Sequence, residues 1–268
     1  MENIINYVTV MNGNYIIIFL IALFYSLERL IGTSFKFDNR LNHFFNNFLF
    51  MIAFYFTNIA FAVVQVAVIN WSSNNQLGLF NWIEIPLWLK VIIGVMCLDL
   101  TSYWSHRLAH NSPLLWRLHR VHHSDNTMDT STFFRGHPVE VFLFGTSSVI
   151  ATIIFGLDLS ILSVYLIVQL PFLVSQHANF QLPDWIDTFF GKVFITPNIH
   201  KVHHEQDQFY TDSNFADIFI FWDKLFGTYK YLPVQNIRYG LKEFDDDKKQ
   251  SFWYLIVSPF IKIDRKID

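Results

Sequence analysis

Long apolar runs alternate along the chain with short polar connections. A helix needs about 20 mostly apolar residues to cross the hydrocarbon core of a bilayer. The runs over residues 14–32, 45–70 and 82–104 reach this length. A further pair, 139–157 and 159–176, is separated by a Gly-Leu-Asp turn and predicts either two full spans or a shallower helical hairpin. The pattern therefore predicts an all-α integral membrane helical bundle of about four spans.

Basic residues indicate which connections face the cytoplasm. The first connection carries three of them, Arg29, Lys36 and Arg40. The second, residues 72–78, carries none. Because Lys and Arg collect in cytoplasmic loops, the first connection is predicted to be cytoplasmic. Threading the spans from there places residues 105–138 and the tail from His177 on the same side, where we expect them to form a cytoplasmic helical cap.

The pattern becomes amphipathic after residue 177. The stretch LPDWIDTFFGKVF, residues 182–194, predicts a helix that lies on the membrane surface, with Pro183 and Asp184 at its start. No internal repeat or appended soluble domain is recognisable. Residues 1–268 are therefore expected to form a single membrane-embedded domain.

Composition supports the membrane assignment and narrows the function. Hydrophobic residues make up 52% of the chain and charged residues 15%, whereas soluble domains carry about 25% charge. The net charge of -3 shows no basic excess, so nucleic acid is not a predicted partner. The single cysteine, Cys97, excludes an intramolecular disulfide and a cysteine metal site. The N-terminus lacks the positive region of a signal peptide, so the first apolar run is interpreted as a retained span.

The candidate chemistry lies in the histidines. Eight of the eleven form three boxes: His106 and His110 (H-x-x-x-H), His119, His122 and His123 (H-x-x-H-H), and His200, His203 and His204 (H-x-x-H-H). Each residue of a helix turns about 100°, so the rings of one box lie on one face. Imidazole suits iron, zinc, copper and nickel, and eight rings are enough for two metal ions. A pH switch would also use histidines, but it would not need a repeated ligand spacing.

The order of these boxes between paired apolar spans resembles the fatty acid hydroxylase and sterol desaturase superfamily of integral-membrane di-iron oxygenases. Five stretches carry the resemblance: DLTSYWSHRLAH (99–110), WRLHRVHHSD (116–125), FRGHPVE (134–140), QHANF (176–180) and the stretch from HKVHH to WDKLFGTY (200–229). The likeness extends over about residues 40–230. The histidine-box core occupies about residues 95–230.

The resemblance implies that the eight box histidines hold two iron ions and that dioxygen is a co-substrate. It also implies that a lipid, such as a fatty acyl chain or a sterol or isoprenoid lipid, is hydroxylated or desaturated. His177 is similar to an additional histidine that many members place between the second and third boxes, so it joins the predicted metal ligands. His137, in the R-x-H-P-x-E pattern, is a further predicted ligand, with a donor to a ligand or a helix cap as alternatives. Asn179, Asp217 and Asp223 are candidates for supporting the ligands, although Asp223 also fits an anchor for the tail.

Asp99, Tyr103 and Asn179 are the candidate catalytic residues. Asp99 lies deep in a predicted span, where acidic residues are functional candidates by default. On a helix it shares a face with Tyr103, His106 and His110. We expect Asp99 to accept a hydrogen bond from the far nitrogen of a metal-bound imidazole. Pairing with an arginine, or lining a wet cavity, are the alternatives.

Electrons must come from outside the chain, because it contains no flavin fingerprint, haem attachment motif or CxxC. We expect a ferredoxin, a cytochrome or their reductase to dock on the cytoplasmic face. The compact form resembles the sterol desaturase-like branch common in bacteria, which favours a bacterial inner membrane over the endoplasmic reticulum. The competing hypothesis is a membrane metal-binding or transport protein that holds zinc or iron. A transporter would place its ligands within the spans near the midplane, whereas the boxes lie beyond the spans on one side.

Overall fold

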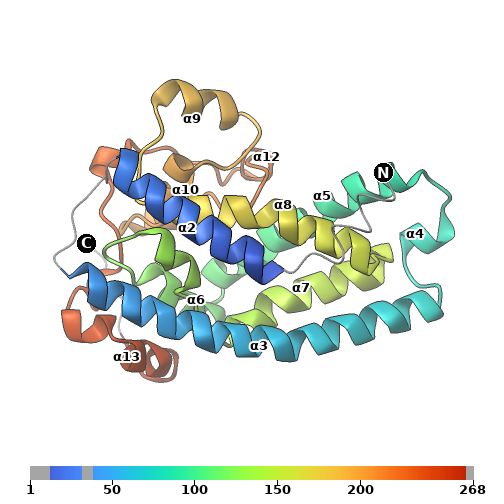
Figure 1. Cartoon of the computed structure of the whole chain (residues 1–268), viewed down its shortest axis with the longest axis horizontal. Helices are drawn as coiled ribbons and strands as arrows, with labels where there is room; N and C mark the ends of the chain where they lie inside the picture. The colour runs from blue at the N-terminus through green and yellow to red at the C-terminus, as the bar shows by residue number, and fades with distance from the viewer. Residues whose placement is uncertain (1–12, 32–38, 264–268) are drawn as a thin grey trace.

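The computed structural model describes residues 13–31 and 39–263. The α-helices are α2 (Gly13–Ile31), α3 (Arg40–Asn74), α4 (Leu79–Trp82), α5 (Leu87–Asn111), α6 (Pro113–His123), α7 (Glu140–Phe155), α8 (Leu159–His177), α9 (Asp184–Phe190), α10 (Pro197–His203), α11 (Gln208–Thr211), α12 (Phe221–Leu225) and α13 (Phe252–Val257). Short 3-10 helices are η1 (Thr130–Phe134), η2 (Val234–Asn236), η3 (Lys242–Phe244), η4 (Asp247–Gln250) and η5 (Ser258–Phe260). Two isolated β-bridges are the only extended pairings in the described residues (Figure 1). The all-α prediction is confirmed.

Within residues 13–31 and 39–263, four helical stretches are long and apolar enough to cross a membrane, which confirms the predicted number of spans. They are α2, α5, α8 and the stretch Arg40–Trp82, which begins with α3. The third predicted run, 82–104, has the wrong boundaries. Its helix starts at Leu87, after the extended Pro86, and continues to Asn111, so the first histidine box belongs to the same helix as the span.

The turn between α7 and α8 is tight. Gly156 ends α7 in the left-handed conformation, with φ 70°, and Asp158 caps α8 by accepting a hydrogen bond from Ile161 N at 2.9 Å. At 16 residues, α7 is about 24 Å long and falls short of a hydrocarbon core of about 30 Å. The alternative of two full spans is therefore wrong for α7.

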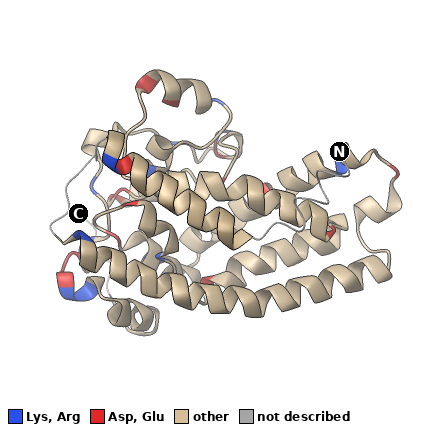
Figure 2. Cartoon of the chain, in the orientation of Figure 1, with Lys and Arg blue, Asp and Glu red and all other residues tan. Residues whose placement is uncertain are grey.

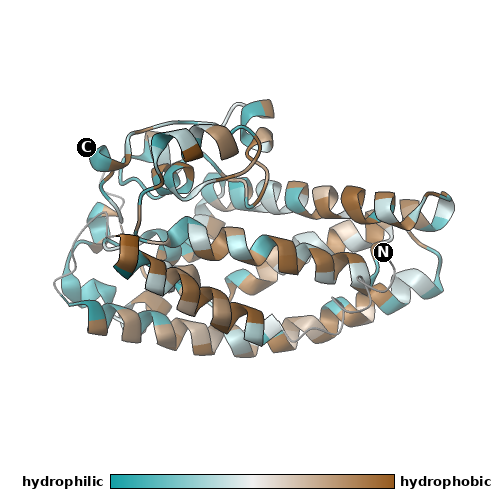
Figure 3. Cartoon of the chain, turned by 45° about the horizontal axis from the view of Figure 1, so that its top comes forward, coloured by the Kyte–Doolittle hydropathy of each residue, from teal (hydrophilic) through white to brown (hydrophobic). Residues whose placement is uncertain are grey.

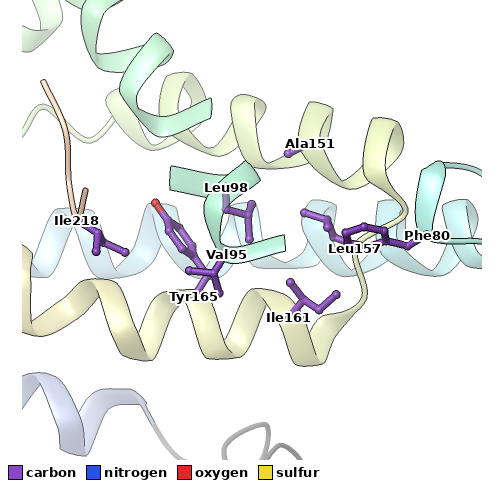
Figure 4. Packing of buried hydrophobic residues seen from close by; sticks show 8 residues of the cluster. All are labelled: Phe80, Val95, Leu98, Ala151, Leu157, Ile161, Tyr165 and Ile218. Atoms are coloured by element: carbon purple, nitrogen blue, oxygen red, sulfur yellow. The ribbon is translucent and has the colours of Figure 1, made fainter. Parts of the chain in front are cut away.

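Helix α5 packs against both α7 and α8, so these two helices do not form a closed hairpin. Figure 4 shows Leu98 of α5 in this core, with Ala151 of α7 on one side and Tyr165 of α8 on the other. Gly94 permits the approach of α5 to α8, because a Cβ atom there would lie 2.4 Å from Cγ2 of Ile161. The helix that carries the first histidine box is thus held at the centre of the bundle.

Helices α6, α9, α10, α12 and α13 gather at one end of the bundle, beyond the C-termini of α5 and α8, whereas α4 lies at the opposite end (Figure 1). Most of the charged residues lie at this end (Figure 2), and hydrophobic residues dominate the long helices (Figure 3). Helix α9 follows Pro183, as predicted for the surface helix, and exposes Trp185 and Phe189. The structure therefore has the predicted cap, and this cap carries the second and third boxes.

Candidate metal centre

The histidines converge in two groups, and within each group the candidate ligand atoms all lie within 4.8 Å of one another. The first group contains His106, His110, His119, His123 and His203. The second contains His122, His177, His200 and His204. The eight box histidines and His177 are therefore brought together, although they come from α5, α6, α8 and the α10 region. Imidazoles of the two groups are in contact, since the rings of His123 and His204 stack at 4.6 Å.

Helix geometry explains why each H-x-x-H-H box serves both groups. Residues four apart on a helix differ by about 40°, so His119 and His123 point the same way and enter the first group. His122, three positions after His119, is rotated by about 60° from it in the direction away from His123, and it enters the second group. In the third box the assignment is reversed, because His200 and His204 enter the second group. Each box therefore ties the two groups together.

A sharp corner brings the first two boxes face to face. Helix α5 ends at Asn111, Ser112 caps α6 by accepting from Leu115 N, and Pro113 starts α6. Proline at the first helical position costs nothing, because its missing N–H would have no partner there. The corner places Nε2 of His106 at 3.1 Å from Nε2 of His119. Asn111, Ser112 and Pro113 therefore form the break between α5 and α6.

Backbone carbonyls fix the tautomers of four of these rings. Nδ1 of His106 lies 2.9 Å from the Phe215 carbonyl, and Nδ1 of His203 lies 2.6 Å from that of Ser213. In the second group, Nδ1 of His122 and of His177 meet carbonyls at 3.1 and 2.7 Å. A carbonyl oxygen can only accept, so each Nδ1 must carry the proton. Each Nε2 of these rings therefore presents a lone pair to the interior of its group.

The facing Nε2 atoms fit a bound cation. Nε2 of His177 lies 3.1 Å from Nε2 of His122 and 3.2 Å from Nε2 of His200, with lone pairs directed into one small space. Protonation does not relieve this arrangement, because burial holds the pKa of His122 and His200 well below its usual range, and the neighbouring imidazoles lower it further. A metal ion in each group would satisfy these nitrogens, so the donor set fits two ions.

Two carboxylates support the first group, and neither was among the predicted site residues. Glu140 Oε1 lies 2.7 Å from Nδ1 of His119, and Asp212 Oδ1 lies 3.1 Å from Nδ1 of His110. Carboxylates in this position orient a ligating imidazole and raise its basicity. Glu140 closes the R-x-H-P-x-E pattern, so its place in that pattern was the available signal. No comparable signal marks Asp212.

Lys201 connects the segment after α8 to α10. Its side chain is completely buried, and Nζ donates to the carbonyls of Ala178 and Phe180 at 2.8 and 2.9 Å. Burial lowers the pKa of Lys201 to about 7. The contact fixes the residues that follow His177 against the helix that carries His200, so it stabilises the second group. Its place inside HKVHH was the available sequence signal.

His137 lies outside both groups. Nε2 of His137 is 3.2 Å from the Ile256 carbonyl, and Nδ1 accepts from Val139 N at 3.3 Å. Both ring nitrogens are therefore engaged with backbone groups of the cap. We therefore do not include His137 among the proposed metal ligands.

Asp99 does not contact an imidazole, so the expected hydrogen bond to a ligand is not formed. Its carboxylate accepts from Ile218 N at 3.1 Å, Phe219 N at 3.2 Å and Trp222 Nε1 at 2.9 Å. It is fully buried, and the two alternatives, an arginine partner and a wet cavity, do not apply either. The expectation failed because residues 215–222 insert beside α5, and their backbone N–H groups need an acceptor away from water.

Tyr103, which was predicted as catalytic, and Asp217 and Asp223, which were predicted to support the ligands, form hydrogen bonds in the inserted segment or in the residues that follow it. Tyr103 is buried, and its hydroxyl meets Thr228 Oγ1 at 2.8 Å rather than an imidazole. Asp223 accepts from Phe215 N at 2.8 Å and from Thr228 Oγ1 at 2.7 Å, which matches an anchor for the tail. Asp217 accepts hydrogen bonds from Ser102 and Gln169. Asp223 therefore holds the backbone of Phe215, and the carbonyl of Phe215 in turn fixes the ring of His106.

A family model described as fatty acid hydroxylase matches residues 91–228, about half of the chain. The chain belongs to the fatty acid hydroxylase family. The matched range contains all the histidines of both groups, together with Glu140 and Asp212.

Relatives of this family member have lipid-related names. Alkylglycerol monooxygenase of Danio rerio is 32% identical over 164 residues, which are 56% of this chain and 33% of that protein. The Homo sapiens enzyme is 30% identical over 174 residues, or 61% of this chain and 35% of its own length. Very-long-chain aldehyde decarbonylase GL1-11 of Oryza sativa subsp. indica is 28% identical over 172 residues, 62% of this chain and 64% of that protein. No solved structure matches the chain.

The matched region spans only about a third of the alkylglycerol monooxygenases. The relatives come from animals and a plant, so they give no support to the expected bacterial inner membrane.

Glu28, which lies outside the range matched by the fatty acid hydroxylase model, contacts two segments next to the second group. Its side chain is completely buried at the end of α2. Oε1 accepts from Thr130 N at 2.7 Å and from Asn179 N at 2.8 Å. Glu28 therefore joins η1, which follows the second box, to the segment that follows His177. The sequence signal for Glu28 was an acidic residue near the end of a predicted span. The same contact places the backbone of Asn179, a predicted catalytic residue, next to Glu28.

Proposed function

We propose that the chain is a membrane-bound di-iron oxygenase, formed by a single membrane-embedded domain, that hydroxylates or desaturates a lipid with dioxygen and external electrons. The observation that carries the proposal is the pair of adjacent, buried imidazole groups with converging Nε2 atoms. Imidazole suits iron, and nine such ligands exceed the need of a four-coordinate structural zinc. The family and the names of the relatives favour a lipid as the substrate.

The residues of both groups would hold the two irons, one in each group. Bound iron supplies the activation of dioxygen that insertion of oxygen into a C–H bond, or desaturation, requires. Glu140 and Asp212 orient His119 and His110. Backbone carbonyls keep the proton on Nδ1 of the other fixed rings, so that Nε2 stays available as a ligand. Because the rings are buried, water is largely excluded from the surrounding space.

The substrate class is proposed from the relatives. The names of the relatives refer to alkylglycerols and very-long-chain aldehydes. Both are lipids with long alkyl chains. We propose a substrate of this kind, with fatty acyl, sterol and isoprenoid lipids in the same class. Its alkyl chain would lie among the spans.

We also propose that the cap faces the cytoplasm and receives an external ferredoxin, cytochrome or reductase. The support is the collection of basic residues in the connections at this end of the bundle. The charged residues of the cap in Figure 2 offer polar surface to such a partner. Protease protection of epitopes in residues 245–249, in sealed vesicles of known orientation, tests the side.

Metal analysis of the purified protein tests the proposal most directly. We expect about two irons per chain, and loss of iron and of lipid oxidation in His122→Ala. Comparing the lipids of cells with and without the protein, under an atmosphere of labelled dioxygen, would then identify the product. Stoichiometric zinc that crosses vesicle membranes without dioxygen consumption would instead make the chain a metal-binding or transport protein.

A further inference from the structure

The C-terminal helix α13 and the η5 turn are apolar on two opposite faces. One face is buried, since Leu255 is completely enclosed by a cluster that includes Phe50 and Phe244. The other face exposes Trp253 (74%), Val257 (50%) and Phe260 (69%). These three residues follow the i, i+4, i+7 spacing of one helix face. We call them the C-terminal apolar face.

The C-terminal apolar face is held in place by hydrogen bonds from three parts of the fold. Phe252 N donates to Asn46 Oδ1 of α3 at 2.8 Å. From α6, Arg120 donates to the Ser258 carbonyl at 2.6 Å. The His137 ring meets the Ile256 carbonyl at 3.2 Å. These contacts fix the orientation of α13. In the described structure its outer face stays largely exposed, although the ring of Phe260 lies 5.8 Å from that of His137.

We propose that the C-terminal apolar face lies in the interfacial region of the bilayer. Helix α13 packs against the N-terminal part of α3 (Figure 1). There α3 exposes Leu41 and Phe45, which belong to a stretch apolar enough to span the membrane. We infer that the C-terminal apolar face and the exposed apolar side chains at the start of α3 belong to one continuous surface. A helix that is apolar all round must be covered, and Trp and Phe are favoured where the acyl chains meet the headgroups.

A bilayer fits this face better than a second copy of the chain. Three side chains of this size cover at most a few hundred Å², whereas stable protein interfaces bury about 1,200–2,000 Å² in total. The charged η4, which carries Asp247, Lys248 and Lys249, directly precedes α13. The chain thus changes from charged to apolar over a few residues, as at the boundary between water and membrane.

This placement sets the depth of the metal centre. The η5 turn packs against α6, which carries His119, His122 and His123. If the C-terminal apolar face lies among the headgroups, both histidine groups lie close to the membrane surface. A lipid could then reach them without leaving the bilayer. The position of the C-terminal apolar face in the bilayer does not depend on which reaction the chain catalyses.

Site-specific labelling of the full chain tests the placement. The single Cys97 is first replaced (Cys97→Ala), and one cysteine is introduced as Trp253→Cys, Val257→Cys or Phe260→Cys. Each variant carries an environment-sensitive fluorophore in vesicles of phosphatidylcholine and phosphatidylglycerol. Lys248→Cys is the matched control, because Lys248 is exposed on η4. Nitroxide-labelled lipid and aqueous iodide serve as the two quenchers.

We expect the nitroxide lipid to quench labels on the C-terminal apolar face roughly threefold more strongly than the control label, with iodide showing the opposite order. Equal quenching by iodide at all four positions would overturn the proposal. Protection from both quenchers would also overturn it, in favour of a protein partner. Three positions are labelled independently. If one variant does not fold, the other two still test whether the C-terminal apolar face contacts lipid.

Discussion

The first and second histidine groups differ in what holds their rings. In the first group, two rings are backed by carboxylates, His119 by Glu140 and His110 by Asp212. Those acids come from α7 and from the end of α11, so the group is oriented by charged side chains. A carboxylate partner raises the basicity of a ligating imidazole.

In the described residues, no carboxylate is hydrogen-bonded to a ring of the second group. Backbone carbonyls face Nδ1 of His122 and of His177. Nδ1 of His200 and of His204 are buried and have no hydrogen-bond partner in the described structure. This group depends instead on contacts such as those of Lys201, which fix the surrounding backbone. We infer that the first group binds its metal more tightly and that the second loses its metal first.

Loss of a ligand from either group should have the largest effect. His119→Ala and His122→Ala remove neighbouring rings that belong to different groups. We expect each to lower lipid oxidation at least about 100-fold, because both metals are required. Metal analysis should separate them, with the weakly bound metal lost in His122→Ala and the tightly bound one in His119→Ala. His137→Ala, which lies outside both groups, should keep both metals, and equal loss in all three variants would contradict the division.

Removing a carboxylate should weaken the first group alone. Asp212→Asn keeps the size of the side chain but removes the negative charge beside His110, so we expect metal affinity to fall about 10–100-fold. Chelator competition measures this loss, and the second metal should be released at an unchanged chelator concentration. Asp207→Asn is the matched control, since Asp207 only caps α11. If both metals weakened together, the two groups would not be independent.

Part of this organisation could be predicted from local sequence. The length of the apolar runs predicts the spans, because a helix must cross the lipid core. The i, i+4 spacing of His119 and His123 predicts rings on one face, because helix geometry is the same everywhere. The corner at residues 111–113 is local as well. These features depend on residues close together in the chain.

The supporting contacts were not predictable, because they join distant segments. Glu28 and Thr130 are 102 positions apart, and so are His110 and Asp212. Asp99 was assigned the wrong partner for the same reason. Its helix face was correct, but the pattern does not show that residues 215–222 insert beside it. Spacing therefore predicted the three histidine boxes, whereas the residues that orient the rings could be identified only from the fold.

Glu28→Ala should act on the second group from outside the matched family segment. The substitution removes the carboxylate that accepts from Thr130 N and Asn179 N, and loss of the buried hydrogen bond of Thr130 alone costs about 1–3 kcal/mol. We expect a lower melting temperature and about tenfold weaker binding of the weakly held metal. Arg29→Ala is the control, because Arg29 is the exposed neighbour of Glu28 on α2. Unchanged metal binding in Glu28→Ala, with stability reduced, would assign Glu28 to folding alone.

Asp99→Asn should have the smallest effect on the metals. The three donors around Asp99 all point at its carboxylate, so an amide NH₂ group would face at least one of them. We expect about 1–3 kcal/mol lower stability, measured by thermal unfolding in detergent. Because Phe215 fixes His106 through the same inserted segment, a slight weakening of the first metal should follow. The second metal should not respond, since its rings are fixed by α6, α8 and α10. A larger loss of the second metal than of the first would show that the inserted segment supports both groups equally.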